Sequence, residues 1–128
     1  MRALVDANVF VAAMVEESGD GPATKFFASE HELCTAVTSL MEIRTVLSKK
    51  KRIERAEIER PIDGIVARVD VYALDRDDVL NAYAMQKETF LYPIDCLLLT
   101  LADDIDAELV TFDTELQHAG ATAPTELI

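Results

Sequence analysis

Apolar residues recur along the chain at two spacings, one typical of buried strands and the other of amphipathic helices. Short apolar runs that end in polar or turn residues predict strands at 3–5, 33–37, 69–74 and 109–112, with an edge strand within 121–128. Apolar residues three and four positions apart predict helices at 9–14, 23–30, 39–52, 76–88 and 93–105, and a short helix follows Asp113. Strands therefore alternate with helices through most of the chain.

Turn chemistry marks the boundaries between these elements. Residues 16–22, with Ser18, Gly19, Asp20 and Gly21, predict a loop. Pro61 predicts a break between two short helices, because proline lacks the backbone donor that a helix interior needs. Alternating strands and helices imply right-handed crossovers. We expect an α/β fold in which residues 1–128 form a single three-layer α/β/α domain around a mostly parallel central sheet.

Length and hydropathy limit where the protein acts. The chain has 128 residues, of which 50% are hydrophobic, which is enough for one core. The N-terminus runs from a short apolar stretch directly into charge, unlike a secretory segment. The longest apolar run, at 96–102, is too short to cross a bilayer. We expect a cytoplasmic protein with no membrane partner.

Few residues are available for thiol or imidazole chemistry. Cys34 and Cys96 both lie among apolar neighbours and are interpreted as reduced core thiols. His31 and His118 are the only histidines, so the sequence offers few ligands for a zinc site and few candidates for a Ser-His-Asp triad. Catalysis by this chain would therefore depend mainly on carboxylates.

The net charge of −12 opposes binding to a polyanion. Either of two conditions would remove this repulsion. One is molar salt, in which the Debye length is about 3 Å, and the other is a bound divalent ion together with a local basic patch. The chain has abundant acidic residues and few lysines, a balance that indicates a high-salt cytoplasm, as in a halophilic archaeon.

Four acidic residues are predicted at the ends of elements. Asp6 and Asp113 each follow a predicted strand, and Asp95 and Glu42 lie in the first turns of predicted helices. In a parallel sheet such positions face one crevice, where carboxylates repel one another unless divalent cations neutralise them. Each residue also has a purely structural interpretation: Asp6 and Asp113 as helix N-caps, Glu42 as a capping-box partner of Ser39, and Asp95 as a helix-dipole partner.

Four segments in order carry a family resemblance. They are Leu-Val-Asp-Ala-Asn at 4–8, Thr-Ser-Leu-Met-Glu-Ile at 38–43, the segment 93–102 around Asp95, and Val-Thr-Phe-Asp at 110–113. Together they resemble the successive motifs of PIN domains, including the toxins of VapBC toxin–antitoxin pairs. The sequence departs from that pattern at Cys96, where alanine is common, and at 114–116, which lack an aromatic residue. Neither departure removes a carboxylate.

The resemblance implies a metal-dependent ribonuclease that hydrolyses RNA with Mg²⁺ or Mn²⁺. Asp6, Asp95 and Asp113 would bind the metal and Glu42 would complete the acidic cluster, with Asn8 and Thr111 as accessory polar contacts. The resemblance also implies a protein antitoxin and a homodimer. Separately, the basic run Lys49, Lys50, Lys51 and Arg52 is either an RNA-backbone contact or a solvated helix end.

Three other functions remain open from the sequence. The chain could be a noncatalytic PIN-fold module for RNA or protein binding, or an RNA-processing nuclease without an antitoxin. A phosphatase-like or phospho-acceptor domain is the third. It is disfavoured because Asp6-Ala7-Asn8 lacks the second aspartate of the common phosphotransferase motif.

Overall fold

A computed structural model describes residues 1–16 and 18–128, so Glu17 of the predicted 16–22 loop lies outside the described residues. The strands are β1 (Arg2–Val5), β2 (Glu32–Ala36), β3 (Asp70–Tyr72) and β4 (Glu108–Val110). The α-helices are α1 (Ala7–Val15), α2 (Pro22–Ala28), α3 (Val37–Thr45), α4 (Arg55–Arg68), α5 (Arg76–Glu88), α6 (Pro93–Asp104) and α7 (Thr114–His118). A π-helical turn, η1 (Val46–Lys50), extends α3, and a 3₁₀ turn, η2 (Pro124–Leu127), lies near the C-terminus.

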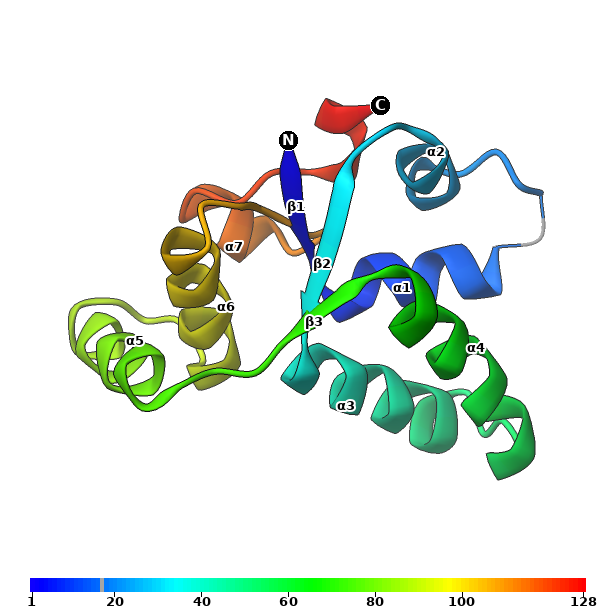
Figure 1. Cartoon of the computed structure of the whole chain (residues 1–128), viewed down its shortest axis with the longest axis horizontal. Helices are drawn as coiled ribbons and strands as arrows, with labels where there is room; N and C mark the ends of the chain where they lie inside the picture. The colour runs from blue at the N-terminus through cyan, green and yellow to red at the C-terminus, as the bar shows by residue number, and fades with distance from the viewer. Residues whose placement is uncertain (17) are drawn as a thin grey trace.

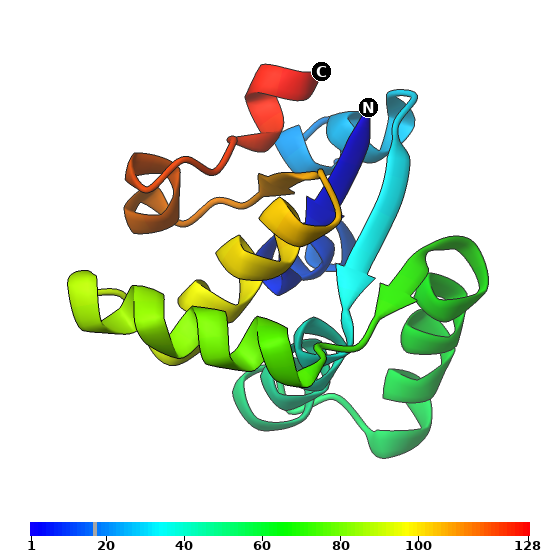
Figure 2. The same cartoon turned by 60° about the vertical axis from the view of Figure 1, so that its left-hand side comes forward.

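The described strands form one sheet in the order β3-β2-β1-β4, and every strand pair is parallel. Helices cover both faces: α1 to α4 lie on one side and α6 and α7 on the other, with α5 packed outside α6 (Figures 1 and 2). This three-layer α/β arrangement confirms the predicted fold class. Among the described residues, no helix has the length and apolar character needed to span a membrane.

Successive side chains of β1 point to opposite faces of the sheet, so they pack in two separate parts of the core. Ala3 and Val5 join a cluster with Phe26 and Ile43 from the α1–α4 layer. Leu4 points the other way and packs in a second cluster that includes Leu98 of α6. Because β1 is central and buried on both faces from Ala3 to Val5, these three residues are continuously apolar rather than alternating.

Helix α4 corrects the prediction that Pro61 separates two short helices. The helix runs unbroken from Arg55 to Arg68 with Pro61 inside it. A proline in a helix interior costs about 3 kcal/mol, but burial of a single isoleucine side chain contributes roughly 1.5–3 kcal/mol. Ile58, Ile62 and Ile65 are all buried on one stripe that crosses the proline, so their burial outweighs the loss.

The C-terminal tail is also not the predicted edge strand. It makes a single parallel bridge, between Thr122 and Val110, and then turns into η2 at Pro124. Proline has no backbone N–H to continue a ladder, but it suits the first position of a helical turn. The tail therefore covers only a short part of the edge of β4.

The start of α3 differs from the predicted capping box. The helix begins at Val37 with Ala36 as its N-cap, and the Ser39 hydroxyl is buried without a hydrogen-bond partner among the described residues. Glu42 consequently lies in the second turn of α3, not in the first. The structural interpretation of Glu42 as a capping residue is wrong.

Replacing Leu4 with alanine tests the two-faced packing of β1. Leu4 is fully buried, so we expect Leu4→Ala to lower the free energy of unfolding by about 2–5 kcal/mol. Val66→Ala on the exposed face of α4 is the matched control and should change it by less than about 0.5 kcal/mol. Urea denaturation followed by circular dichroism measures both; equal losses in the two variants would contradict this packing.

Candidate active site

Strands β1 and β4 lie side by side and end at the same edge of the sheet. The register pairs Val5 with Val110, and the Asp6 amide donates to the Val110 carbonyl at 2.9 Å. Because parallel strands present their carboxyl ends together, residues that follow β1 meet residues that follow β4. Asp6 and Asp113 are thereby brought to one place although 107 positions separate them in the sequence.

The Thr111 hydroxyl joins these two strand ends. It donates to Asp6 Oδ2 at 2.8 Å, and it accepts the Asn8 side-chain amide at 3.0 Å and the Asp113 backbone amide at 3.1 Å. One donor and two acceptor positions are all that a hydroxyl has, so its capacity is fully used. Asn8 Oδ1 also accepts from the Phe112 amide at 3.1 Å. Thr111 itself is fully buried.

Asp6 and Asp113 also cap helices, as their structural interpretations predicted. Asp6 Oδ1 accepts from the Ala7 amide at 2.7 Å at the start of α1. Asp113 Oδ1 accepts from the amides of Glu115 and Leu116 at the start of α7. Each bond uses only part of a carboxylate that offers about four lone-pair sites, so a capping aspartate can still bind a ligand.

A cleft of about 530 Å³ opens at this edge of the sheet and is called the acidic cleft below. Asp95 enters it from the first turn of α6, where Pro93 starts the helix, and Glu42 enters it from α3. The acidic residues of its wall are the four that the sequence predicts: Asp6, Glu42, Asp95 and Asp113. Asn8 lines the cleft too, whereas Thr111 lies buried behind Asp6.

The acidic cleft is electrostatically strained when it holds only carboxylates. Burial raises the pKa of Asp6 above its usual value, and the charges of Glu42 and Asp113 raise it further, against hydrogen bonds from Thr111 and Ala7. Burial likewise raises the pKa of Asp95 to about 6, with Asp113, Asp6 and Glu115 adding to it. Such shifts arise where like charges share a site, and a cation would reverse them.

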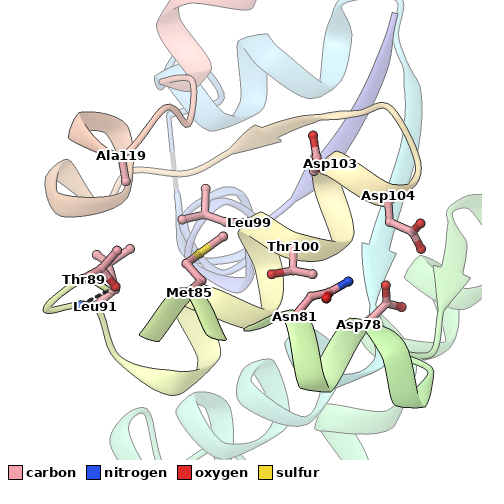
Figure 3. Close-up of a pocket in the computed structure, with 10 residues that line it drawn as sticks. All are labelled: Asp78, Asn81, Met85, Thr89, Leu91, Leu99, Thr100, Asp103, Asp104 and Ala119. Atoms are coloured by element: carbon pink, nitrogen blue, oxygen red, sulfur yellow. Dashed lines mark hydrogen bonds between the residues drawn. The ribbon is translucent and has the colours of Figure 1, made fainter. Parts of the chain in front are cut away.

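The carboxylates of the acidic cleft do not converge tightly. In the part of the chain that the structure describes, three acids with oxygens all within 4.8 Å of one another occur only at Asp75, Asp78 and Asp104. That group lies at a separate cavity between α5 and α6, and Figure 3 shows Asp78 and Asp104 from it. The carboxylates of the acidic cleft are therefore spaced more widely than those of this second group.

The second acidic group has a structural role. The Asp78 amide donates to Asp75 Oδ1 at 2.8 Å and the Asp75 amide donates to Asp78 Oδ2 at 3.1 Å. This is a capping box that begins α5. Asp104 faces Asp78 from the end of α6, and the contact raises the pKa of Asp104. The predicted site residues are not part of this group.

The π-helical turn η1 ends within the basic run at 49–52, after Lys50. Lys50 lines the acidic cleft, whereas Lys49, Lys51 and Arg52 do not. Lys50 is the last residue of the π-helical turn η1, and such turns often occur at functional sites. Within this run, only Lys50 is therefore placed to meet a ligand of the acidic cleft.

Sequence reasoning did not single out the apolar part of the cleft wall. Tyr92 and Ile94, which flank Pro93 before Asp95, line it and are 71% and 39% exposed. The rest of the apolar lining comes from Ala7, Val11, Ala12 and Val46. An exposed aromatic residue beside a candidate active site is a signal, but exposure cannot be read from one sequence.

Comparison with known proteins identifies the family. The family model for the PIN domain matches residues 3–121, nearly the whole chain. The chain belongs to the PIN domain family. The resemblance seen in the four sequence segments is thus confirmed. No functionally curated protein matches the chain.

Solved structures share the PIN fold over almost their full length. VapC20 of Mycobacterium tuberculosis, described as a sarcin-ricin loop cleaving toxin, is 19% identical with a TM-score of 0.78, covering 94% of this chain and 96% of that one. A toxin–antitoxin complex from Klebsiella pneumoniae is 21% identical with a TM-score of 0.73, covering 95% and 97%. VapBC2 of Rickettsia felis, bound to a promoter DNA fragment, is 17% identical with a TM-score of 0.71, covering 93% and 92%.

The raised pKa of Asp95 predicts how the metal-free PIN domain responds to pH. Its folded pKa is about 6 against an ordinary 3.8, so the folded state holds the proton more tightly and stability is lost as pH rises from about 4 through 6. Asp95→Asn removes this loss. We expect this variant to melt at a higher temperature than Asp63→Asn, an equal charge change on exposed α4, at pH 7.

The difference in melting temperature between Asp95→Asn and Asp63→Asn should disappear near pH 4, because Asp95 of the parent is protonated there. Thermal melts in chelator from pH 4 to 7.5 measure it. A constant difference across that range would show that the Asp95 carboxylate is not strained. Adding Mn²⁺ at pH 7 should raise the melting temperature of Asp63→Asn more than that of Asp95→Asn.

Proposed function

We propose that the chain is a metal-dependent endoribonuclease that acts as the toxin of a VapBC-type toxin–antitoxin pair. The observation that carries the proposal is the meeting of Asp6, Glu42, Asp95 and Asp113 on one cleft, from four separate elements. A purely structural role does not explain the strain at Asp6 and Asp95, because a fold gains nothing from burying unneutralised carboxylates together. Membership of the PIN family supports the same chemistry.

The donor set of the acidic cleft fits a hard divalent cation. Carboxylate oxygens, with an amide side chain nearby, are ligands that Mg²⁺ and Mn²⁺ favour, and imidazole or thiolate ligands would be expected for zinc. In this proposal Asp6, Asp95 and Asp113 hold the metal, and Glu42 completes the cluster. The metal, when bound, supplies a lowered pKa for the attacking water and offsets charge on the leaving oxygen.

The protein's own residues orient these groups. The Thr111 hydroxyl holds Asp6 Oδ2 and the Asp113 backbone, and Asn8 ties Thr111 to Phe112. Asn8 and Thr111 are therefore positioning residues for the two aspartates. Lys50 also lines the acidic cleft, and we propose that it contacts an RNA phosphate.

The proposal also covers the biological setting. Residues 1–128 would act as one nuclease domain in the cytoplasm, in a halophile, as the acidic composition indicates. A protein antitoxin is favoured because the similar structures include toxin–antitoxin complexes. A homodimer is favoured because Val79, Leu80 and Tyr83 leave an exposed apolar surface on α5. An RNA-processing role without an antitoxin is the alternative, and the neighbouring gene distinguishes the two.

Asp6→Asn tests the metal chemistry. We expect it to lower Mn²⁺-dependent RNA cleavage at least about 100-fold, because loss even of outer contacts to a metal site costs 10- to 100-fold. Asp63→Asn, which removes the same charge from an exposed position, should retain the parent rate. Cleavage is followed with labelled RNA from 0.1 M to molar salt, and circular dichroism verifies folding. Parent-level cleavage by Asp6→Asn would refute the role of Asp6.

A noncatalytic PIN module would give a different result. In that case, crystals soaked in saturating Mn²⁺ would contain no ion between Asp6, Asp95 and Asp113, and the parent chain would not cleave RNA. We expect an ion bound by these three residues.

Lys50→Ala tests the RNA-backbone contact. One lost phosphate contact should reduce the slope of log affinity against log salt by about 0.7 for single-stranded RNA. Lys87→Ala on α5 removes the same charge away from the acidic cleft and should leave the slope unchanged. Fluorescence anisotropy, with Ca²⁺ replacing the catalytic metal, measures both variants. An unchanged slope for Lys50→Ala would favour the solvated helix end.

A further inference from the structure

A smaller cavity adjoins the acidic cleft and is called the side pocket below. Its volume is about 280 Å³, and it lies between α3 and the first turn of α6. Glu42 and Ile94 line both cavities, so the two meet across these side chains. Thr38, Met41 and Thr45 of α3 complete its wall.

The side pocket combines apolar surface with spare hydrogen-bonding capacity. Met41 is 65% exposed and Ile94 is 39% exposed, and burying such side chains against a ligand would remove apolar area from water. The Thr38 hydroxyl is shielded from solvent and has no hydrogen-bond partner among the described residues. The Thr45 hydroxyl is already used, because it donates to the Met41 carbonyl at 3.0 Å.

These properties match one part of an RNA chain. A nucleobase has flat apolar faces and polar edges, and proteins recognise unpaired bases by stacking and by hydrogen bonds to those edges. The lining favours a base over the sugar-phosphate backbone, because the described residues of its wall include apolar side chains and no basic side chain that could pair with a phosphate. The pocket volume is just below the range of about 300–1,000 Å³ usual for drug-sized ligands, which suits a single base.

We propose that the side pocket binds the base next to the phosphodiester held at the acidic cleft. Met41 and Ile94 would pack on the face of the base. Rotation of the Thr38 side chain about χ1 would bring its shielded hydroxyl to the pocket surface, where it would bond the edge of the base. Such a base must be unpaired, so the substrate is single-stranded or looped RNA. This inference rests on the proposed cleavage at the acidic cleft, since continuity with that cleft is what selects a base over other occupants.

Nuclear magnetic resonance of methionine methyl groups tests binding without requiring cleavage. The probes are the four ribonucleoside 5′-monophosphates, added one at a time to the full chain with Mg²⁺. We expect at least one of them to shift the Met41 methyl resonance in a saturable manner. Met85, which lines the separate cavity shown in Figure 3, is the internal control and should not shift. Unshifted Met41 with all four probes would overturn the proposal.

Base preference is tested with homopolymers of A, C, G and U and with bis(p-nitrophenyl) phosphate, which has no base. We expect Thr38→Val and Met41→Ala each to reduce the kcat/KM ratio between the best and worst homopolymers about fivefold, as expected for one hydrogen bond or a comparable loss of packing. Both variants should hydrolyse bis(p-nitrophenyl) phosphate within about twofold of the parent rate. Val66→Ala, an exposed control on α4, should keep both its homopolymer ratio and its rate with bis(p-nitrophenyl) phosphate within about twofold of the parent.

The outcomes separate this inference from the proposed function. If the parent hydrolyses neither RNA nor bis(p-nitrophenyl) phosphate, but the Met41 methyl shifts, then base binding stands and the nuclease proposal fails. If the parent cleaves RNA and both variants keep its base ratios, the side pocket is not a base subsite. If Met41→Ala instead dissociates a dimer in light scattering while keeping those ratios, the occupant is a second copy of the chain and the proposal is overturned.

Discussion

The hydroxyl of Thr111 is the contact on which the geometry of the acidic cleft depends. It is fully buried and makes one donated and two accepted hydrogen bonds, to Asp6, Asn8 and Asp113. It can do so only because β1 and β4 are parallel neighbours in register. A buried polar group left without partners is costly, so the network stabilises one relative position of the two strand ends. The spacing of Asp6 and Asp113 follows from that position.

Helix capping and ligand binding are compatible roles for the same aspartates. Asp6 and Asp113 cap α1 and α7, and Asp95 lies in the first turn of α6, so each carboxylate lies at a helix N-terminus. The positive end of a helix dipole stabilises an anion there by about 0.3–1 kcal/mol. That gain allows a protein to fold with several acids in one cleft before any cation is present. It does not remove their repulsion, because the pKa values of Asp6 and Asp95 remain raised.

Periodicity predicted most of the fold because burial on both faces of the sheet leaves clear apolar runs. The bounds of α5 and the start of α6 match the prediction. Asp6, Asp95 and Asp113 line the acidic cleft as their strand and helix ends suggested, whereas Glu42 reaches it from the second turn of α3. The failures have local causes. Pro61 did not end the helix, because burial of the apolar stripe around it stabilises a continuous α4. Ser39 was predicted as a cap because the Ser-x-x-Glu spacing does not indicate where the preceding strand ends. Exposure of Met41 and Tyr92 depends on packing between distant elements, so a single sequence could not reveal it.

Under the proposed function, the acidic composition makes uncharged contacts important for RNA binding. With a net charge of −12, attraction to phosphates must come from a bound cation and from local charges such as Lys50. In molar salt the Debye length is about 3 Å, so the repulsion weakens, but the counterion-release contribution of each phosphate contact weakens as well. Packing of a base against Met41 and Ile94 depends on apolar area and is not screened by salt. If the protein is the proposed nuclease of a high-salt cytoplasm, it would therefore obtain more of its affinity for RNA, and most of its selectivity, from the base than from the backbone.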